Sequence, residues 1–128
     1  GSILKDKMKV LPEYGAAYFI LTREDFSNYS IQNGETEGFV NHPLSIRGII
    51  FSVFLREDEH TDEIRISLRS KGDFSVNDLS NRYFHGGGHK NAAGGSFHGS
   101  VQDAEKLLIR AMEENADALK KVSSESIA

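Results

Sequence analysis

The residues best suited to chemistry are concentrated in residues 85–99, which read His-Gly-Gly-Gly-His-Lys-Asn-Ala-Ala-Gly-Gly-Ser-Phe-His-Gly. This segment holds six of the 12 glycines in a chain of 128 residues. Glycine and alanine allow close backbone approach, successive N–H groups can surround an anion, and His89 and Lys90 add donors. We interpret the segment as a loop that binds a phosphate or a base. A flexible turn from a helix to a strand is the alternative, although one or two glycines suffice for that.

A second candidate lies just upstream, where Arg69, Ser70 and Lys71 close an alternating apolar and polar run. Arginine offers a planar fork for phosphate oxygens, and serine offers a small hydroxyl. Ligands of α/β sheets tend to bind at strand ends, so this segment and the glycine-rich one are expected to face one site. Taken alone, the segment is equally typical of a polar strand terminus.

Metal binding and nucleophilic catalysis find little support. His85 and His89 are four residues apart, but the three glycines between them remove the helical geometry of a zinc pair. The chain has no cysteine, and Gly-x-Ser-x-Gly is absent. We therefore predict no metal ligands and no catalytic residues.

The charge pattern allows a local anion site on an acidic body. Fifteen Lys and Arg against 19 Asp and Glu give a net charge of −4, which argues against a broad basic surface for long nucleic acids. Residues 64–90 hold five cations and two anions, a net of +3, which leaves −7 elsewhere. Ordinary scatter of charge on a solvated surface is the alternative.

The elements that must position these residues indicate one α/β (α+β) domain with a mixed β-sheet of about five strands flanked by helices. Residues 1–2 resemble a tag remnant, residues 3–122 form the domain, and residues 123–128 are expected to fray. Strands are predicted at residues 8–12, 16–21, 46–56 and 63–69, and another after the glycines. Helices are predicted at residues 22–29, 75–84 and 101–119, a turn at Asn33 and Gly34, and residues 38–43 are left unassigned.

Two further expectations concern the end of the second helix and the compartment. Gly86, Gly87 and Gly88 are expected to end the helix by supplying a positive φ. The longest uncharged apolar stretch, residues 48–55, is far shorter than a membrane span, so we expect no membrane partner and a cytoplasmic protein.

Two separate motifs, in order, carry a family resemblance. Residues 66–72 read Ile-Ser-Leu-Arg-Ser-Lys-Gly, and residues 86–95 read Gly-Gly-Gly-His-Lys-Asn-Ala-Ala-Gly-Gly. Together they resemble the C-terminal DHH-associated domain of the DHH phosphoesterases. Residues 11–15 and 35–41 also resemble the nano-RNase and pAp-phosphatase branch, often labelled exopolyphosphatase-related, so the resemblance covers roughly residues 8–119. Glu35 and Phe39 stand where that branch usually has Asp and Leu, which leaves the exact substrate open.

The resemblance implies a two-domain enzyme, a manganese-dependent 3′-5′ oligoribonuclease and pAp phosphatase. Its N-terminal DHH domain would hold two manganese ions that activate water, while this domain grips short RNA or DNA, pAp or a related nucleotide. The residues that match the family's substrate-contacting positions are Arg69, Ser70, Gly86, Gly87, Gly88 and His89, with Ala92, Ala93 and Gly94 leaving room behind the ligand. Lys71, Lys90 and Asn91 are further candidates.

The chain contains no Asp-His-His motif, so we expect this domain to bind substrate, to hold no cofactor and to be inactive alone. A free-standing nucleotide or phosphate sensor is the alternative, and a self-sufficient metal hydrolase is the least favoured interpretation. The sequence does not separate pAp from short RNA, short DNA, a cyclic dinucleotide product or polyphosphate, and it does not indicate the oligomeric state.

Overall fold

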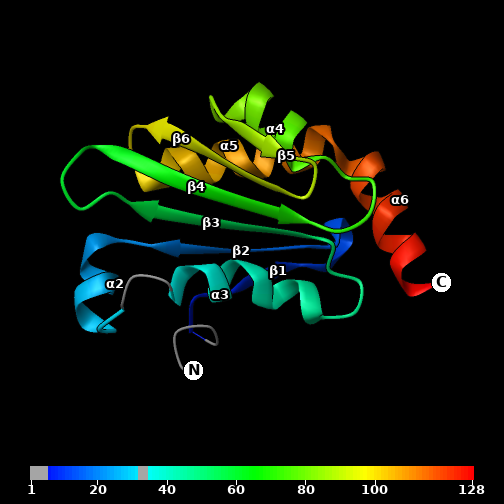
Figure 1. Ribbon diagram of the computed structural model, residues 1–128, viewed down its shortest axis with the longest axis horizontal. Coiled ribbons are helices and arrows are strands. Elements are labelled where there is room, and N and C mark those ends of the chain that lie inside the picture. Colours follow the sequence, from blue (N-terminus) through cyan, green and yellow to red (C-terminus); the bar gives the residue numbers. More distant parts are fainter. Residues whose placement is uncertain (1–5, 32–34) are drawn as a thin grey trace.

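A single mixed sheet of six strands, in the order β1-β2-β3-β4-β6-β5, organises the part of the chain that the computed structural model describes, residues 6–31 and 35–128 (Figure 1). β2 and β3 pair in parallel, and every other neighbouring pair is antiparallel. The single-domain α/β class is thereby confirmed. The strands are β1 (Lys9–Leu11), β2 (Ala16–Leu21), β3 (Phe51–Glu57), β4 (Glu63–Ser70), β5 (Gly87–His89) and β6 (Ala92–His98).

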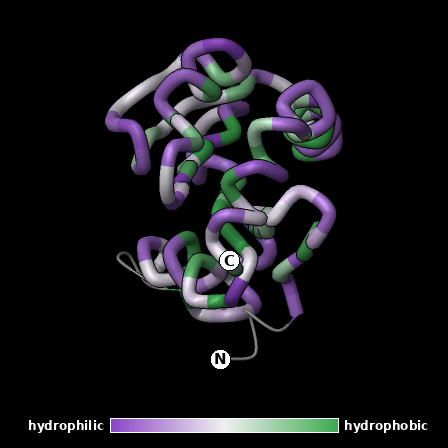
Figure 2. Tube along the Cα trace, turned by 90° about the vertical axis from the view of Figure 1, so that its right-hand side faces the viewer, coloured by the Kyte–Doolittle hydropathy of each residue, from purple (hydrophilic) through white to green (hydrophobic). Residues whose placement is uncertain are grey.

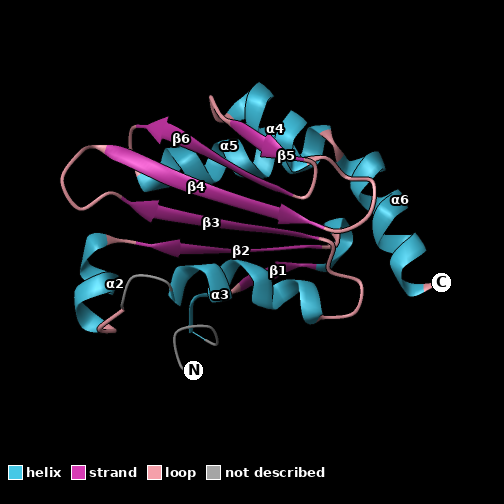
Figure 3. Cartoon of the chain, in the orientation of Figure 1, coloured by secondary structure: helices cyan, strands magenta, loops and turns pink. Residues whose placement is uncertain are grey.

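Helices cover the two faces of the sheet unequally. One face is covered by α4 (Val76–Tyr83), α5 (Val101–Glu114) and α6 (Ala116–Ile127), and the larger apolar core lies beneath them. On the other face α2 (Arg23–Asn28) packs on β2, and α3 (Glu35–Asn41) packs on β2, β3 and β4. Figure 3 shows the two groups of helices on opposite sides of the strands. The outer face of β4 and β6 is therefore less covered than that of β2 and β3.

The alternation of side chains along the strands produces two cores. Phe51, Val53 and Leu55 of β3 point into the larger core, whereas Phe54 points the other way, toward Phe19 and the helix α3. In the side view of Figure 2 the most hydrophobic stretches lie toward the interior and the outer turns are hydrophilic. β3 is buried on both faces, which explains its nearly continuous apolar sequence.

Several predicted boundaries are wrong. The strand predicted from residue 46 begins at Phe51, because a 3-10 turn at His42–Ser45 and a bend at Gly48, with a φ of 87°, occupy the preceding residues. The unassigned residues 38–43 fall in α3 and in that turn. The tag remnant at residues 1–2 and the turn at Asn33 and Gly34 lie outside the described residues.

The predicted C-terminal helix is divided at Asn115, whose side-chain amide donates to the Ala111 carbonyl at 2.7 Å and to the Tyr83 hydroxyl at 3.3 Å. The fraying expected for residues 123–128 stays a prediction, and residues 123–127 form the last part of α6. α6 continues to Ile127, and Ser123 Oγ donates to the Gly48 carbonyl at 2.7 Å, which ties the end of the helix to the bend before β3.

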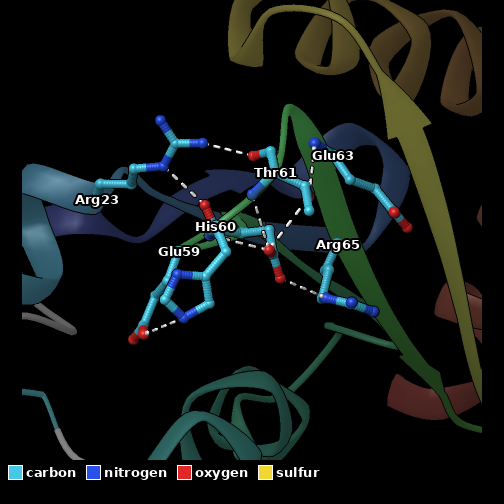
Figure 4. A network of polar contacts seen from close by, with 7 residues as sticks. Arg23, Glu59, His60, Thr61, Glu63 and Arg65 are labelled. Atoms are coloured by element: carbon cyan, nitrogen blue, oxygen red, sulfur yellow. Dashed lines mark hydrogen bonds and ion pairs between the residues drawn. The ribbon is translucent and has the colours of Figure 1, made fainter.

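The hairpin that joins β3 to β4 is held by a polar network (Figure 4). Asp58 accepts hydrogen bonds from the backbone N–H groups of His60 and Thr61, and Arg65 Nε donates to its Oδ1 at 2.9 Å. Arg23, at the start of α2, donates to the carbonyls of Asp58 and Thr61. Among the described residues, no helix is long and apolar enough to cross a membrane.

Candidate functional site

The glycine-rich segment forms a β-hairpin rather than a flexible loop. β5 and β6 pair antiparallel, with Gly87 opposite Gly94 and His89 opposite Ala92. Because β5 contains three residues and is mostly glycine, the sequence did not predict it as a strand. The helix α4 precedes the hairpin and begins at its N-cap Ser75, whose Oγ accepts from the Asp78 N–H.

The prediction that Gly86, Gly87 and Gly88 end this helix with a positive φ is wrong in its residue. His85, with a φ of 53°, takes the left-handed conformation directly after the C-cap Phe84. The Gly86 N–H then bonds back to the Ser80 carbonyl at 3.2 Å. The glycines that follow therefore serve another purpose.

Most of these glycines are required by packing within the domain. A Cβ on Gly86 would overlap the Gly94 carbonyl, one on Gly95 would lie 2.7 Å from the Phe84 carbonyl oxygen, and one on Gly88 would lie 2.7 Å from the Ala92 carbonyl oxygen. Such distances are too short for any side chain. The hairpin therefore lies so close to α4 and to itself that only glycine fits at these positions.

Gly94 is different. A Cβ at Gly94 would meet its nearest atom, the Ile66 carbonyl oxygen, at 3.6 Å, an ordinary contact distance. Gly94 is exposed, whereas its neighbour Ala93 is buried. Alternation along the strand thus places Gly94 on the less covered face of the sheet, where no internal contact requires a glycine.

Arg69 lies beside Gly94 on that face. In the register of the sheet, Arg69 of β4 stands opposite Ala92 of β6, and Ala92 stands opposite His89 of β5, so these three residues form one row across three strands. Gly94 belongs to the next row, opposite Ser67. The small residues Ala92 and Gly94 of β6 therefore lie next to a guanidinium group.

The Arg69 guanidinium is already hydrogen-bonded within the domain. Its Nη1 donates to the carbonyls of Leu68 at 3.0 Å and Ala93 at 3.5 Å, and its Nη2 donates to both carboxylate oxygens of Glu37, at 2.9 and 3.1 Å. Hydrogen bonding from Arg69 lowers the pKa of Glu37 below its usual value. The sequence did not predict Glu37 as a site residue, although it lies within the motif at residues 35–41.

Ser70 and Asn91 connect the two motifs inside the domain. Ser70 is buried, and its Oγ donates to the Phe74 carbonyl at 2.6 Å while accepting from Asn91 Nδ2 at 2.9 Å. Asn91 also donates to the Gly72 carbonyl at 3.1 Å. These bonds hold the end of β4 against the turn between β5 and β6.

The two lysines do not converge on Arg69. Lys71 Nζ donates to the Leu44 carbonyl at 2.6 Å, and Lys90 Nζ forms an ion pair with Asp73 at 2.6 Å. The structure thus brings together Arg69, Ala92 and Gly94 on one surface, and the backbone of His89 lies in the same row of the sheet. Ser70 and Asn91 lie beneath the turn between β5 and β6, where their hydrogen bonds hold the two motifs together.

The residues that the structure describes do not form a metal centre. Within residues 6–31 and 35–128, no group of three or more His, Cys, Asp or Glu side chains is placed to hold a metal ion. The two manganese ions that the family resemblance implies thus find no ligand set in the described part of this chain.

The DHHA1 domain family matches residues 15–122. The chain therefore belongs to the DHHA1 family, the domain that accompanies the catalytic domain of DHH phosphoesterases, as the two motifs predicted.

Two solved structures are similar to the chain. An exopolyphosphatase-related protein from Bacteroides fragilis is 45% identical, with a TM-score of 0.86, over 94% of this chain and 34% of that one. A pGpG-specific phosphodiesterase from Vibrio cholerae shares the fold, with a TM-score of 0.63 at 16% identity, over 91% of this chain and 37% of that one.

Among curated proteins, a 3′,5′-cyclic-nucleotide phosphodiesterase from Helicobacter pylori is 30% identical over 77 residues, which are 55% of this chain and 22% of that protein. The chain spans between 22% and 37% of the length of these three relatives.

Proposed function

We propose that this domain binds the nucleotide end of a phosphoester substrate, with a short RNA or DNA oligonucleotide or pAp as the ligand class. The observation that carries the proposal is Gly94: it is exposed on the sheet beside Arg69, and nothing inside the domain requires a glycine there. Close contact between the backbone and a ligand requires a residue without a side chain, and a glycine that internal packing does not require meets that need.

The residues divide into contacting and supporting groups. Arg69 offers charge-assisted hydrogen bonds to phosphate oxygens, His89 offers an exposed imidazole in the same row, and Gly94 lets the ligand lie flat against the sheet. Ser70 and Asn91 hold the two motifs together, so we assign them a positioning role in place of direct contact.

The names of the relatives support the substrate class. Two of the similar proteins are phosphodiesterases that act on a dinucleotide or a cyclic nucleotide, and each is much longer than this chain. We infer that hydrolysis needs an N-terminal DHH domain with two manganese ions, and that this domain supplies one wall of the cleft.

The experiment is an NMR titration of the domain with pAp and with a 5′-phosphorylated dinucleotide, since shift changes report weak binding. Arg69→Ala and His89→Ala should each weaken binding, and Gly94→Ala should weaken it at least about fivefold, because a methyl group forced into a close contact costs roughly 1–3 kcal/mol. Arg110→Ala, an exposed arginine on α5, is the matched control.

Wild-type affinity for both ligands in all three site variants would refute the proposed site. Loss of binding in Arg110→Ala to the same degree as in Arg69→Ala would show a general charge effect instead.

A further inference from the structure

Glu37 occupies the solvent side of the guanidinium group to which the proposed function assigns a phosphate. The Arg69 side chain is 18% exposed and the Glu37 side chain is 65% exposed, so the carboxylate lies between Arg69 and the solvent. One nitrogen, Nη2, donates to both carboxylate oxygens. A ligand that approaches Arg69 from outside meets Glu37 first.

The fold builds this contact. Phe39 of α3 stacks on Phe54 of β3, with ring centroids 6.2 Å apart, and lies 6.4 Å from Phe19 of β2. These buried rings fix α3 on the sheet and hold Glu37 above the end of β4. Asn41, one turn further along α3, donates to the Glu37 carbonyl at 3.0 Å and to its Oε1 at 3.3 Å.

We propose that Glu37 stands in for the phosphate on Arg69 in the ligand-free domain and sets the affinity of the site by competing with the ligand. This inference rests on the proposed function. Carboxylate and phosphate oxygens accept the same hydrogen bonds from a guanidinium group, so the two acceptors cannot share Nη2 in full.

A purely positioning role for Glu37 is less favoured by the geometry. The other guanidinium nitrogen, Nη1, donates to the carbonyls of Leu68 and Ala93, and these bonds remain when the carboxylate leaves. Glu37 is mostly exposed, so it can turn into solvent at little cost once a ligand arrives.

The expected gain in affinity has two sources. Glu37→Gln removes a competing acceptor from Arg69, and it removes a negative charge from beside the phosphate of the ligand. Exposed ion pairs are weak, and like charges near a protein surface repel modestly, so replacing Glu37 by glutamine should raise the affinity for phosphate ligands by about threefold to tenfold. The gain should shrink at high salt, because screening weakens both effects.

The test compares the wild type, Glu37→Gln, Arg69→Ala and the double variant by NMR titration with pAp at low and high salt. Glu113→Gln on α5 is the control, since it makes the same change of net charge on the opposite face. Thermal unfolding of each variant checks that the fold is retained.

We expect tighter binding in Glu37→Gln, no gain in Glu113→Gln, and a clearly smaller gain from Glu37→Gln when Arg69 is already alanine, because only the like-charge repulsion is then relieved. Unchanged or weaker binding in Glu37→Gln, with Arg69→Ala still harmful, would overturn this inference and leave the proposed function standing. An Arg69→Ala variant that binds like the wild type would instead contradict the phosphate contact that the proposed function assigns to Arg69.

Discussion

Residues of one type serve different purposes in this domain, and their surroundings decide which. Gly86, Gly88 and Gly95 are required by contacts inside the hairpin, whereas Gly94 meets nothing closer than 3.6 Å. Serines divide in the same way: the buried Ser80 Oγ donates to the Gly94 carbonyl at 2.7 Å, while the buried Ser52 Oγ has no hydrogen-bond partner among the described residues.

Two serine substitutions test this difference. Ser52→Ala should leave the free energy of unfolding unchanged or raise it by about 1 kcal/mol, because it removes a buried hydroxyl that makes no hydrogen bond. Ser80→Ala should lower it by about 1 kcal/mol or more, because the Gly94 carbonyl loses its donor. Chemical denaturation measures both, and equal losses in the two variants would contradict the assignment.

At the scale of elements, the hairpin of β5 and β6 depends on how closely it approaches α4. The Ser96 N–H donates to the Phe84 carbonyl at 2.8 Å, and Gly86 bonds to Ser80, so the hairpin is joined to the C-terminal end of the helix. These contacts attach the glycine-rich hairpin to α4 over its whole length from Gly86 to Ser96.

A pair of neighbouring glycine substitutions tests the packing. Gly95→Ala should destabilise the domain by about 1–3 kcal/mol, because its Cβ would press on the Phe84 carbonyl oxygen. Gly94→Ala should be neutral or slightly stabilising, since an added Cβ lies at ordinary contact distance and alanine is favoured over glycine in a strand. Urea unfolding of the two variants measures the change in the free energy of unfolding. A loss of stability in Gly94→Ala as large as in Gly95→Ala would show that both glycines are required by packing.

At the scale of the whole molecule, carboxylates that accept hydrogen bonds stabilise this acidic domain. Hydrogen bonds from Arg69, Arg65 and Lys90 lower the pKa of Glu37, Asp58 and Asp73, respectively. For Asp25, burial raises the pKa, but hydrogen bonds from Thr22 and Lys7 outweigh it and lower the pKa overall. Since Asp25 is buried, its contribution is the least screened of these.

The domain should therefore lose stability in acid. A carboxylate whose pKa is lowered by folding stabilises the fold fully above its unfolded pKa near 4, and this contribution is lost as the pH falls through the folded value. Asp25→Asn should lower the free energy of unfolding by about 1 kcal/mol at pH 7, because the ion pair with Lys7 at 2.9 Å is lost.

The measurement is urea unfolding of the wild type and Asp25→Asn at pH 7 and pH 3. The gap between them should narrow at pH 3, where the wild-type carboxyl is also becoming protonated. A gap of the same size at both pH values would contradict the role of the Asp25 charge.

Much of the fold could be predicted where local patterns are strong. The capping box at Thr22 and Asp25, the alternation along β4 and the apolar stripe of α5 each predicted an element that the structure contains, because periodicity and capping act within a few residues. The predicted boundaries are wrong where contacts with residues distant in the sequence determine where an element ends. Asn115 divides the last helix through a contact with Tyr83, and Ser123 holds α6 in place through Gly48.

The sequence by itself determined the family and the residues of the two motifs, since side-chain chemistry and spacing are written along the chain. Only the tertiary structure decided which of those residues lie exposed on the sheet and which make hydrogen bonds inside the domain. Pairing in the sheet places Arg69, Ala92 and His89 in one row, and the packing of α3 brings Glu37 onto Arg69 from 32 residues away. Such partners are set by the register of strands and the burial of aromatic rings, which no local pattern specifies.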